Sequence, residues 1–257
     1  MRYLNAFALP ELASDLPPTG VSVAIDVLRA TTTITTALRS GAERVLPFET
    51  VEEALVAKRG LVERRPDDAD KIVLGGERGG LPIEGFDFGN SPDLYTPENV
   101  EGKTLLFTTT NGTKAILSCR GIVLLAAFVN AEAVVRRILS ESAETISIVC
   151  AGTNGGFTEE DLLLAGLLVD RLTRRSSEFA LNVQAEVARE FWRERAATPL
   201  VEALKASTGG QNLRKIGLTK DIYDAANLDA FEEVAEFRVG EIKLDSRFKR
   251  QTNVQTH

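Results

Sequence analysis

The sequence predicts an α/β fold in which helices cover both faces of a mainly parallel or mixed sheet. Short runs of β-branched residues alternate with amphipathic stretches along the chain. Several of these runs end in polar loops that lead into helical patterns. The length of 257 residues is enough for one sizeable domain, which we expect over residues 1–245, followed by a tail at 246–257. The pattern also allows two lobes, about 1–120 and 121–245, with a site in the cleft between them.

The first half of the chain supplies regular elements up to about residue 74. Residues 21–25 form a predicted buried strand that ends at Asp26, and residues 31–40 a helix closed by Gly41. Further predicted elements are a strand at 44–48, a helix at 51–64 stopped by Pro66, and a short strand at 71–74.

Residues 75–97 break the regular pattern because Gly, Pro, Asn and Asp cluster there. A long irregular connection inside a compact protein is uncommon unless it is functional or disordered. Three aromatic residues, Phe86, Phe88 and Tyr95, favour order over disorder. We therefore expect an ordered functional segment.

Regular structure resumes at a predicted strand over residues 103–108 and continues to residue 244. The predicted elements are a helix at 113–119, strands at 121–126 and 145–150 with a helix at 131–141 between them, a helix at 159–174, a mostly helical stretch at 181–216 broken at Pro199 and Gly209-Gly210, and a final strand or hairpin at 236–244.

Composition excludes several classes of function. The chain has 37 acidic and 30 basic side chains, a formal net charge of −7, which argues against a general nucleic-acid binder. It shows neither a signal peptide nor an apolar run long enough to span a bilayer, so we expect a cytoplasmic, soluble protein without a membrane partner.

Histidine and cysteine are scarce. The single histidine, His257, is the last residue, which argues against a Ser-His-Asp triad, a Cys-His dyad and a His-ligated zinc site. Cys119 and Cys150 do not form a disulfide framework, and we expect reduced thiols. Cys150 ends a strand beside a polar loop, but a buried core thiol is favoured there over a nucleophile.

Three strand ends carry similar loops, at residues 26–33, 108–113 and 151–156. In parallel α/β sheets ligands bind beyond the carboxyl ends of the strands, where helix N-termini can hold an oxyanion such as phosphate. Thr, Asn and Gly are also ordinary capping and turn residues, and for any one loop that is the commoner role. Three such loops together with the glycine-rich segment favour ligand binding. None matches the phosphate loop of P-loop NTPases or the dinucleotide fingerprint.

Carboxylates lie in or next to these polar loops and the glycine-rich segment. Asp26 ends the first of these strands, Glu77 sits between two glycine pairs, and Glu160 and Asp161 open a helix. Oxygen ligands without His or Cys suggest Mg²⁺, with Asp26, Glu77 and Asp161 as the candidate ligands. For Glu160 and Asp161, complementing the helix dipole is an equally good interpretation.

Two arginines lie beside these carboxylates, Arg29 and Arg78. A guanidinium can bind phosphate or carboxylate through two parallel hydrogen bonds, although a surface ion pair is the alternative. The remaining candidate substrate-binding residues come from the polar loops; for Asn90 and Ser91 considered alone, stabilising a turn is the favoured interpretation. They are Thr31, Thr32, Asn90, Ser91, Asn111, Gly112, Thr113 and Gly152.

Taken in order, these motifs resemble the 2-phosphosulfolactate phosphatase family. Each motif is weak alone and the ordered set is specific; it covers about residues 20–170 and is thinner after about 175. The matching stretches are residues 25–33 (IDVLRATTT), 76–80 (GERGG), 85–86 (GF), 89–92 (GNSP), 110–113 (TNGT) and 150–152 (CAG), followed by Glu160-Asp161.

The resemblance implies a Mg²⁺-dependent acid phosphatase that hydrolyses 2-phospho-3-sulfolactate to 3-sulfolactate and phosphate, a step in coenzyme M synthesis. Similar proteins also occur in many bacteria that are not expected to make coenzyme M. For these members, the alternative substrate is the phosphate ester of another 2-hydroxy acid. Either a water molecule or Asp26 attacks the phosphorus, and the sequence leaves both routes open. The alternative is a non-catalytic sensor of a phosphorylated metabolite. The expected partners are a small anionic phosphate ester and a second copy in a homodimer, the commonest soluble assembly.

Overall fold

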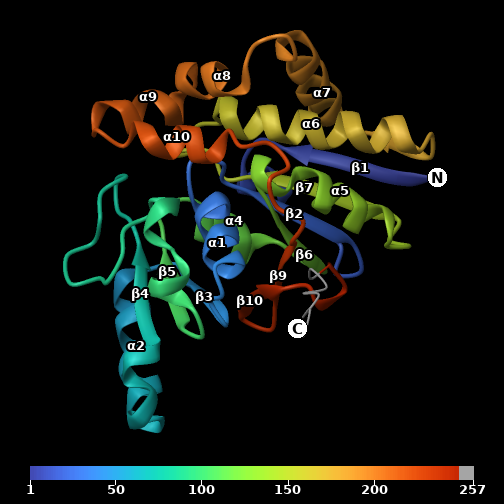
Figure 1. The fold of residues 1–257 in the computed structure, drawn as a ribbon. Helices are drawn as coiled ribbons and strands as arrows, with labels where there is room; N and C mark the ends of the chain where they lie inside the picture. The colour runs from blue at the N-terminus through green and yellow to red at the C-terminus, as the bar shows by residue number, and fades with distance from the viewer. Residues whose placement is uncertain (249–257) are drawn as a thin grey trace, which may run out of the picture.

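A computed structural model of the protein describes residues 1–248 and shows one sheet with helices on both faces (Figure 1). The strand order across the sheet is β4-β5-β3-β10-β9-β6-β2-β7-β1-β8. The strands are β1 Arg2–Phe7, β2 Val21–Ile25, β3 Arg44–Phe48, β4 Ile72–Gly76, β5 Thr104–Thr108, β6 Ile122–Ala126, β7 Thr145–Cys150, β8 Phe179–Leu181, β9 Ala235–Arg238 and β10 Glu241–Leu244. The predicted layered α/β fold is confirmed.

Three clusters of buried apolar side chains hold the layers together. Helices α5, α6 and α7 pack on one face of the strands β1, β2 and β7, and α2 packs on the same side of β4 and β5. Helices α1 and α4 pack on the opposite face. The helices are α1 Ala30–Arg39, α2 Val51–Arg64, α3 Pro97–Val100, α4 Gly112–Ser118, α5 Ala131–Leu139, α6 Glu159–Arg175, α7 Val183–Arg195, α8 Leu200–Ala206, α9 Thr208–Lys215 and α10 Thr219–Ala225.

The sheet contains two parallel sets of strands joined by a hairpin. Strands β8, β1, β7, β2 and β6 are parallel to one another, and so are β3, β5 and β4. The hairpin β9–β10 pairs antiparallel with β6 on one side and with β3 on the other. Three antiparallel pairings therefore lie between β6 and β3, and as a result β2 and β5 run in opposite directions.

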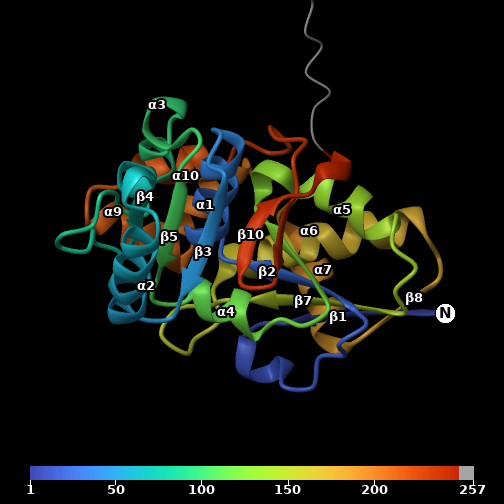
Figure 2. The ribbon, with the colours of Figure 1, turned by 90° about the horizontal axis from the view of Figure 1, so that it is seen from below.

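Twist brings the ends of the two sets back together. Five steps separate β2 from β5 in the strand order, and at about 20–25° per step they rotate β5 by roughly 100–125° relative to β2. The segments that follow β2 and β5 therefore meet, with Asp26 and Thr110 lining one pocket, while α1 and α4 contact each other on one face of the sheet. Figure 2 shows the sheet from below, where the labels β4, β5, β3, β10 and β2 follow one another from left to right. This curvature positions the candidate site.

Some predictions of secondary structure need correction. Strands β1 and β8 were not expected, because β1 mixes polar and apolar residues near the sheet edge and β8 has only three residues. Gly209 and Gly210 do not break a helix; they form the first turn of α9, and the break lies at Ser207, whose side chain accepts a hydrogen bond from Gly210 N. The hairpin predicted at residues 236–244 is confirmed as β9–β10.

The remaining predictions about organisation stay predictions. All ten strands between residues 2 and 244 belong to one sheet, and β1 and β2 lie among strands from the second half of the chain. The predicted tail begins with a short 3₁₀ turn, Ser246–Phe248, and the rest of it, including His257, lies outside the described residues. Within residues 1–248 no helix has the length and apolar character needed to cross a membrane.

Candidate active site

The three polar loops and the glycine-rich segment come together around one pocket of about 270 Å³. Its lining takes residues from the ends of β2, β4, β5 and β7, and α9 forms a further wall. The residues are Asp26, Leu28, Arg29, Glu77, Gly79, Gly80, Asn90, Thr110, Asn111, Gly152, Thr153, Asn154, Gly209, Asn212, Leu213, Lys215 and Ile216. Segments distant in the sequence thus line one pocket.

Asp26 follows the buried strand β2 and is held by the first turn of α1. Its backbone N–H donates to Thr31 Oγ1 at 3.1 Å, and Thr31 Oγ1 donates to Asp26 O at 2.9 Å. A Cβ on Gly112 would collide with the Oδ2 atom of Asp26, so glycine at the start of α4 leaves room for this carboxylate. Burial, and next the negative charge of Glu77, raise the pKa of Asp26 to about 7.

Glu77 follows β4 and is fixed by hydrogen bonds from two loops. Its Oε1 accepts from Thr110 N at 2.7 Å, and its Oε2 accepts from Gly80 N at 2.6 Å and from Thr110 Oγ1 at 3.2 Å. The β4 loop and the β5 loop are therefore joined through one carboxylate. Oε1 keeps a lone pair for a further ligand, while both acceptor sites of Oε2 are used by these hydrogen bonds.

Asp161 and Glu160, at the start of α6, lie beneath the pocket rather than in its lining. Asp161 accepts from Val27 N at 2.9 Å and from Gly152 N at 3.1 Å, which ties the β2 loop to the β7 loop. Burial raises the pKa of both carboxyls; for Asp161, Asp26 and Glu160 add to the effect. Asp161 thus positions two loops, which the sequence did not predict.

Four carboxyl groups lie in or beneath the pocket. Asp26, Glu77, Glu160 and Asp161 are close enough for their charges to interact. Still, within residues 1–248 no three His, Cys, Asp or Glu side chains are grouped so as to hold a metal ion between them. The predicted ligand set of Asp26, Glu77 and Asp161 stays a prediction; of the three, Asp26 and Glu77 line the pocket.

Arg29 connects the pocket to α10. Its Nη1 donates to Asp221 Oδ2 at 2.7 Å and to Ser91 Oγ at 3.2 Å, and its Nη2 donates to Gly80 O at 2.6 Å. Ser91 Oγ in turn donates to Asp221 Oδ2 at 2.8 Å. Ser91 therefore orients Arg29 instead of lining the pocket, and Arg29 retains Nε and one N–H of Nη2 without a partner within residues 1–248.

Asn90 has unused hydrogen-bonding capacity. The residue lines the pocket, is 4% exposed, and its Oδ1 is buried without a hydrogen-bond partner within residues 1–248. Its backbone carbonyl accepts from Thr33 Oγ1 at 2.7 Å, which fixes the loop against α1. A buried polar atom without a partner is costly, so a ligand that supplies the missing bond is favoured here.

The structure does not bring every predicted residue to the pocket. Arg78 turns away from it: Nη1 donates to Glu77 O, and Nη2 donates to Glu49 O and Thr108 Oγ1. The hydroxyls of the predicted binding threonines are bonded to nearby backbone carbonyls. These are Thr31 to Asp26, Thr32 to Val27, and Thr113 to Thr109.

Cys150 is a core thiol, as the favoured interpretation predicted. It is buried at the end of β7. Burial, and then the charges of Asp161 and Glu160, hold its pKa well above the usual value, which disfavours the nucleophilic thiolate. Cys119 is also a free, buried thiol.

Sequence reasoning missed the residues that the C-terminal half supplies. Asp221 follows no motif, and Asn212 and Lys215 lie on a helix that was expected to be interrupted. Asn154, in the β7 loop, has a φ of 52°, and its backbone N–H donates to Asn111 Oδ1 at 3.3 Å. The one signal present in the sequence was that Asn154 belongs to the third polar loop, at residues 151–156.

Together the fold and the pocket define an α/β protein with a small polar pocket at converging strand ends. The chain belongs to the 2-phosphosulpholactate phosphatase family, which it matches over residues 7–240. That family is named for a phosphoric monoester hydrolase.

Individual relatives agree with this assignment. The chain is 38% identical over 244 residues to a probable 2-phosphosulfolactate phosphatase of Caldicellulosiruptor saccharolyticus, covering 93% of this chain and 97% of the relative. A protein of the same name from Thermotoga petrophila is 41% identical over 214 residues, 83% of this chain and 87% of the relative. Another from Parasynechococcus marenigrum is 43% identical over 210 residues, 80% and 84% of the two chains.

Proposed function

We propose that this protein is a Mg²⁺-dependent phosphatase that hydrolyses the phosphate ester of a 2-hydroxy acid, with 2-phosphosulfolactate as the substrate. The observation that carries the proposal is the convergence of Asp26, Glu77 and Arg29 on one pocket in a chain of this family. A volume of about 270 Å³ suits a small ester, because drug-sized ligands occupy roughly 300–1,000 Å³.

The donors in the pocket fit Mg²⁺ held by fewer protein ligands than the sequence suggested. Mg²⁺ is commonly bound by one or two carboxylates together with water and substrate phosphate. Asp26 and Glu77 line the pocket and would hold the ion, while Asp161 is occupied in joining two loops. When bound, Mg²⁺ supplies a positive charge that offsets the charge developing on the phosphoryl oxygens.

The protein groups then orient the ester. The unpartnered N–H groups of Arg29 suit the phosphate or the carboxylate of the substrate. Asn90 supplies a further polar group at the wall, and the N–H groups at the start of α4 lie beside Asp26. The attacking group is a water molecule or the Asp26 carboxylate; both stay open.

The experiment is a phosphate-release assay on 2-phosphosulfolactate and 2-phospholactate, with Mg²⁺ and with a chelator. We expect turnover that the chelator abolishes, and losses of at least about a hundredfold in kcat for Asp26→Asn and Glu77→Gln. Glu84→Gln, an exposed carboxylate in the same loop as Glu77, is the matched control and should retain activity. Stoichiometric binding of the ester without phosphate release would instead favour a sensor, and unimpaired Asp26→Asn turnover would contradict the assignment.

A further inference from the structure

Helix α9 forms one complete wall of the pocket and is held at both ends. At its start, Gly209 N donates to Glu160 Oε2 at 3.4 Å, and a Cβ on Gly209 would meet Leu28 Cβ at 3.3 Å. After its last turn, Ile216 lies against the glycine-rich loop, where a Cβ on Gly80 would be 3.1 Å from Ile216 Cδ1. The helix therefore spans the pocket from the carboxylates beneath it to the loop that carries Gly80.

Two polar side chains on α9 line the pocket without protein partners. Asn212 and Lys215 are three residues apart, and so share one face of the helix. Neither side chain makes a hydrogen bond or an ion pair within residues 1–248, while Leu213 between them is buried and anchors the helix in the core. Both are thus available to a ligand and carried by a rigid element.

The charges of the pocket are divided between its walls. Asp26 and Glu77 lie on the strand-end side, and the charge of Arg29 is already balanced by Asp221 at 2.7 Å. Lys215 is the other basic residue in the lining, on the opposite, helical side. Lys215 therefore supplies an uncompensated positive charge in the pocket for a second acid group of the substrate.

We propose that Lys215, assisted by Asn212, binds the acidic group of the substrate that lies farthest from the phosphate. In 2-phosphosulfolactate that group is the sulfonate. The inference rests on the proposed phosphatase function and adds a specificity element: α9 selects esters that carry an acid remote from the scissile bond. An ammonium suits this role because it acts as a point charge on a flexible stem and does not require a planar partner.

The test compares two esters that differ by the sulfonate, 2-phosphosulfolactate and 2-phospholactate. For Lys215→Met we expect KM for 2-phosphosulfolactate to rise about tenfold, with kcat and the KM for 2-phospholactate changed less than about twofold. Lys215→Arg should restore most of the affinity, and Asn212→Ala should raise the same KM more weakly.

Arg214→Met is the matched control, since Arg214 is the adjacent cation on α9 and lines a different pocket with Tyr223 and Lys205. It should leave both KM values unchanged. Equal increases in KM for the two esters in Lys215→Met, or no increase beyond that of Arg214→Met, would overturn the inference. Failure of the wild-type protein to release phosphate from either ester would instead overturn the proposed function. Binding of 3-sulfolactate measured by calorimetry would then still test Lys215, because the loss of affinity in Lys215→Met does not require turnover.

Discussion

The guanidinium of Arg29 and the carboxylate of Asp221 lie 2.7 Å apart, and their side chains are only 3% and 2% exposed. Arg29 precedes α1 and Asp221 is in α10, 192 residues later. Ser91 bonds to both, so three distant segments meet at one ion pair. Burial raises the pKa of Asp221, and the hydrogen bond from Arg29 opposes that shift. Together with Ser91 and Gly80 O, Asp221 fixes the orientation of the Arg29 guanidinium.

Replacing Asp221 should disturb both stability and substrate binding. Asp221→Asn removes the ion-pair partner of the buried Arg29, and removing one partner of a buried pair costs about 3–5 kcal/mol. We expect the free energy of unfolding in urea to fall by about 3 kcal/mol, and KM for the ester to rise about tenfold as Arg29 loses its fixed orientation.

Asp224→Asn provides the comparison for Asp221, because it removes a carboxylate from the same helix that pairs with exposed Lys220. It should change stability by less than about 0.5 kcal/mol. An Asp221→Asn protein with wild-type KM and a lowered unfolding free energy would show that Asp221 is purely structural.

Gly112 should be essential for the geometry of Asp26. A Cβ there would overlap Asp26 Oδ2 and Ala30 Cβ, where α4 begins against α1. We expect Gly112→Ala to cost about 1–3 kcal/mol through overpacking and to lower kcat by more than about tenfold, since the carboxylate must move. Gly60→Ala, inside α2 with only an ordinary contact to Arg64, should retain both stability and activity. Wild-type kcat in Gly112→Ala would contradict a fixed role for Asp26.

Sequence patterns predicted the strands β2 to β7 and the loops that follow them, because turn chemistry and periodicity are local. They also predicted that Asp26, Glu77 and Arg29 belong to one site. They did not predict how the sheet curves, since the order of strands and the insertion of β9–β10 depend on long-range packing. The observed contacts of Arg78 and Asp161 differ from the predicted ones for the same reason. Tertiary packing decides whether a polar residue beside a loop faces the pocket or the backbone, and both residues bond to backbone groups.

Cys150 should be dispensable for catalysis despite its place next to the β7 loop. Its thiol is buried and its pKa is held well above the usual value, so the thiolate is scarce at neutral pH. We expect Cys150→Ala to keep kcat/KM within about twofold while losing about 1 kcal/mol of stability from the cavity. The native protein should also resist iodoacetamide until it is unfolded. Rapid alkylation with loss of activity would instead indicate that Cys150 acts as a nucleophile.

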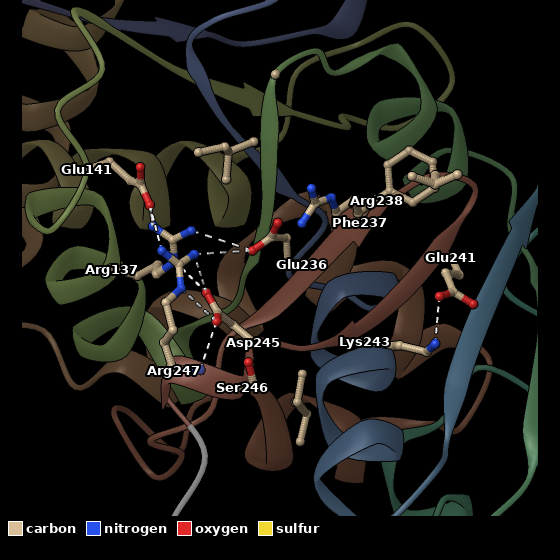
Figure 3. A pocket seen from close by; sticks show the side chains of 14 residues that line it. Arg137, Glu141, Glu236, Phe237, Arg238, Glu241, Lys243, Asp245, Ser246 and Arg247 are labelled. Atoms are coloured by element: carbon tan, nitrogen blue, oxygen red, sulfur yellow. Dashed lines mark hydrogen bonds and ion pairs between the residues drawn. The ribbon is translucent and has the colours of Figure 1, made fainter.

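A second charged cluster, away from the candidate site, fastens the C-terminal hairpin to α5 (Figure 3). The fully buried Arg137 bonds to Glu141 and, through Nε at 2.6 Å, to Asp245 Oδ2, while Arg247 bonds to the same two carboxylates. Glu236 on β9 faces both arginines. The adjacent pocket is lined by charges that already neutralise one another, which marks the cluster as a structural contact.

Because it contains Asp245, this cluster should make the free energy of unfolding depend on pH in the acidic range. Its hydrogen bonds with Arg247 and Arg137 outweigh the effect of burial and lower its pKa to about 2. Because the folded pKa is depressed, the stabilisation is complete above the unfolded pKa of about 4 and is lost as the pH falls toward 2; it amounts to about 2 kcal/mol. Urea unfolding of Asp245→Asn and wild type should differ by about this amount at pH 7, and the difference should shrink between pH 5 and pH 2.5.

Asp68→Asn, which removes an exposed partner of Lys71, should show little difference at either pH. A gap between Asp245→Asn and wild type that stays constant with pH would mean that packing around Asp245, and not its charge, holds the hairpin in place.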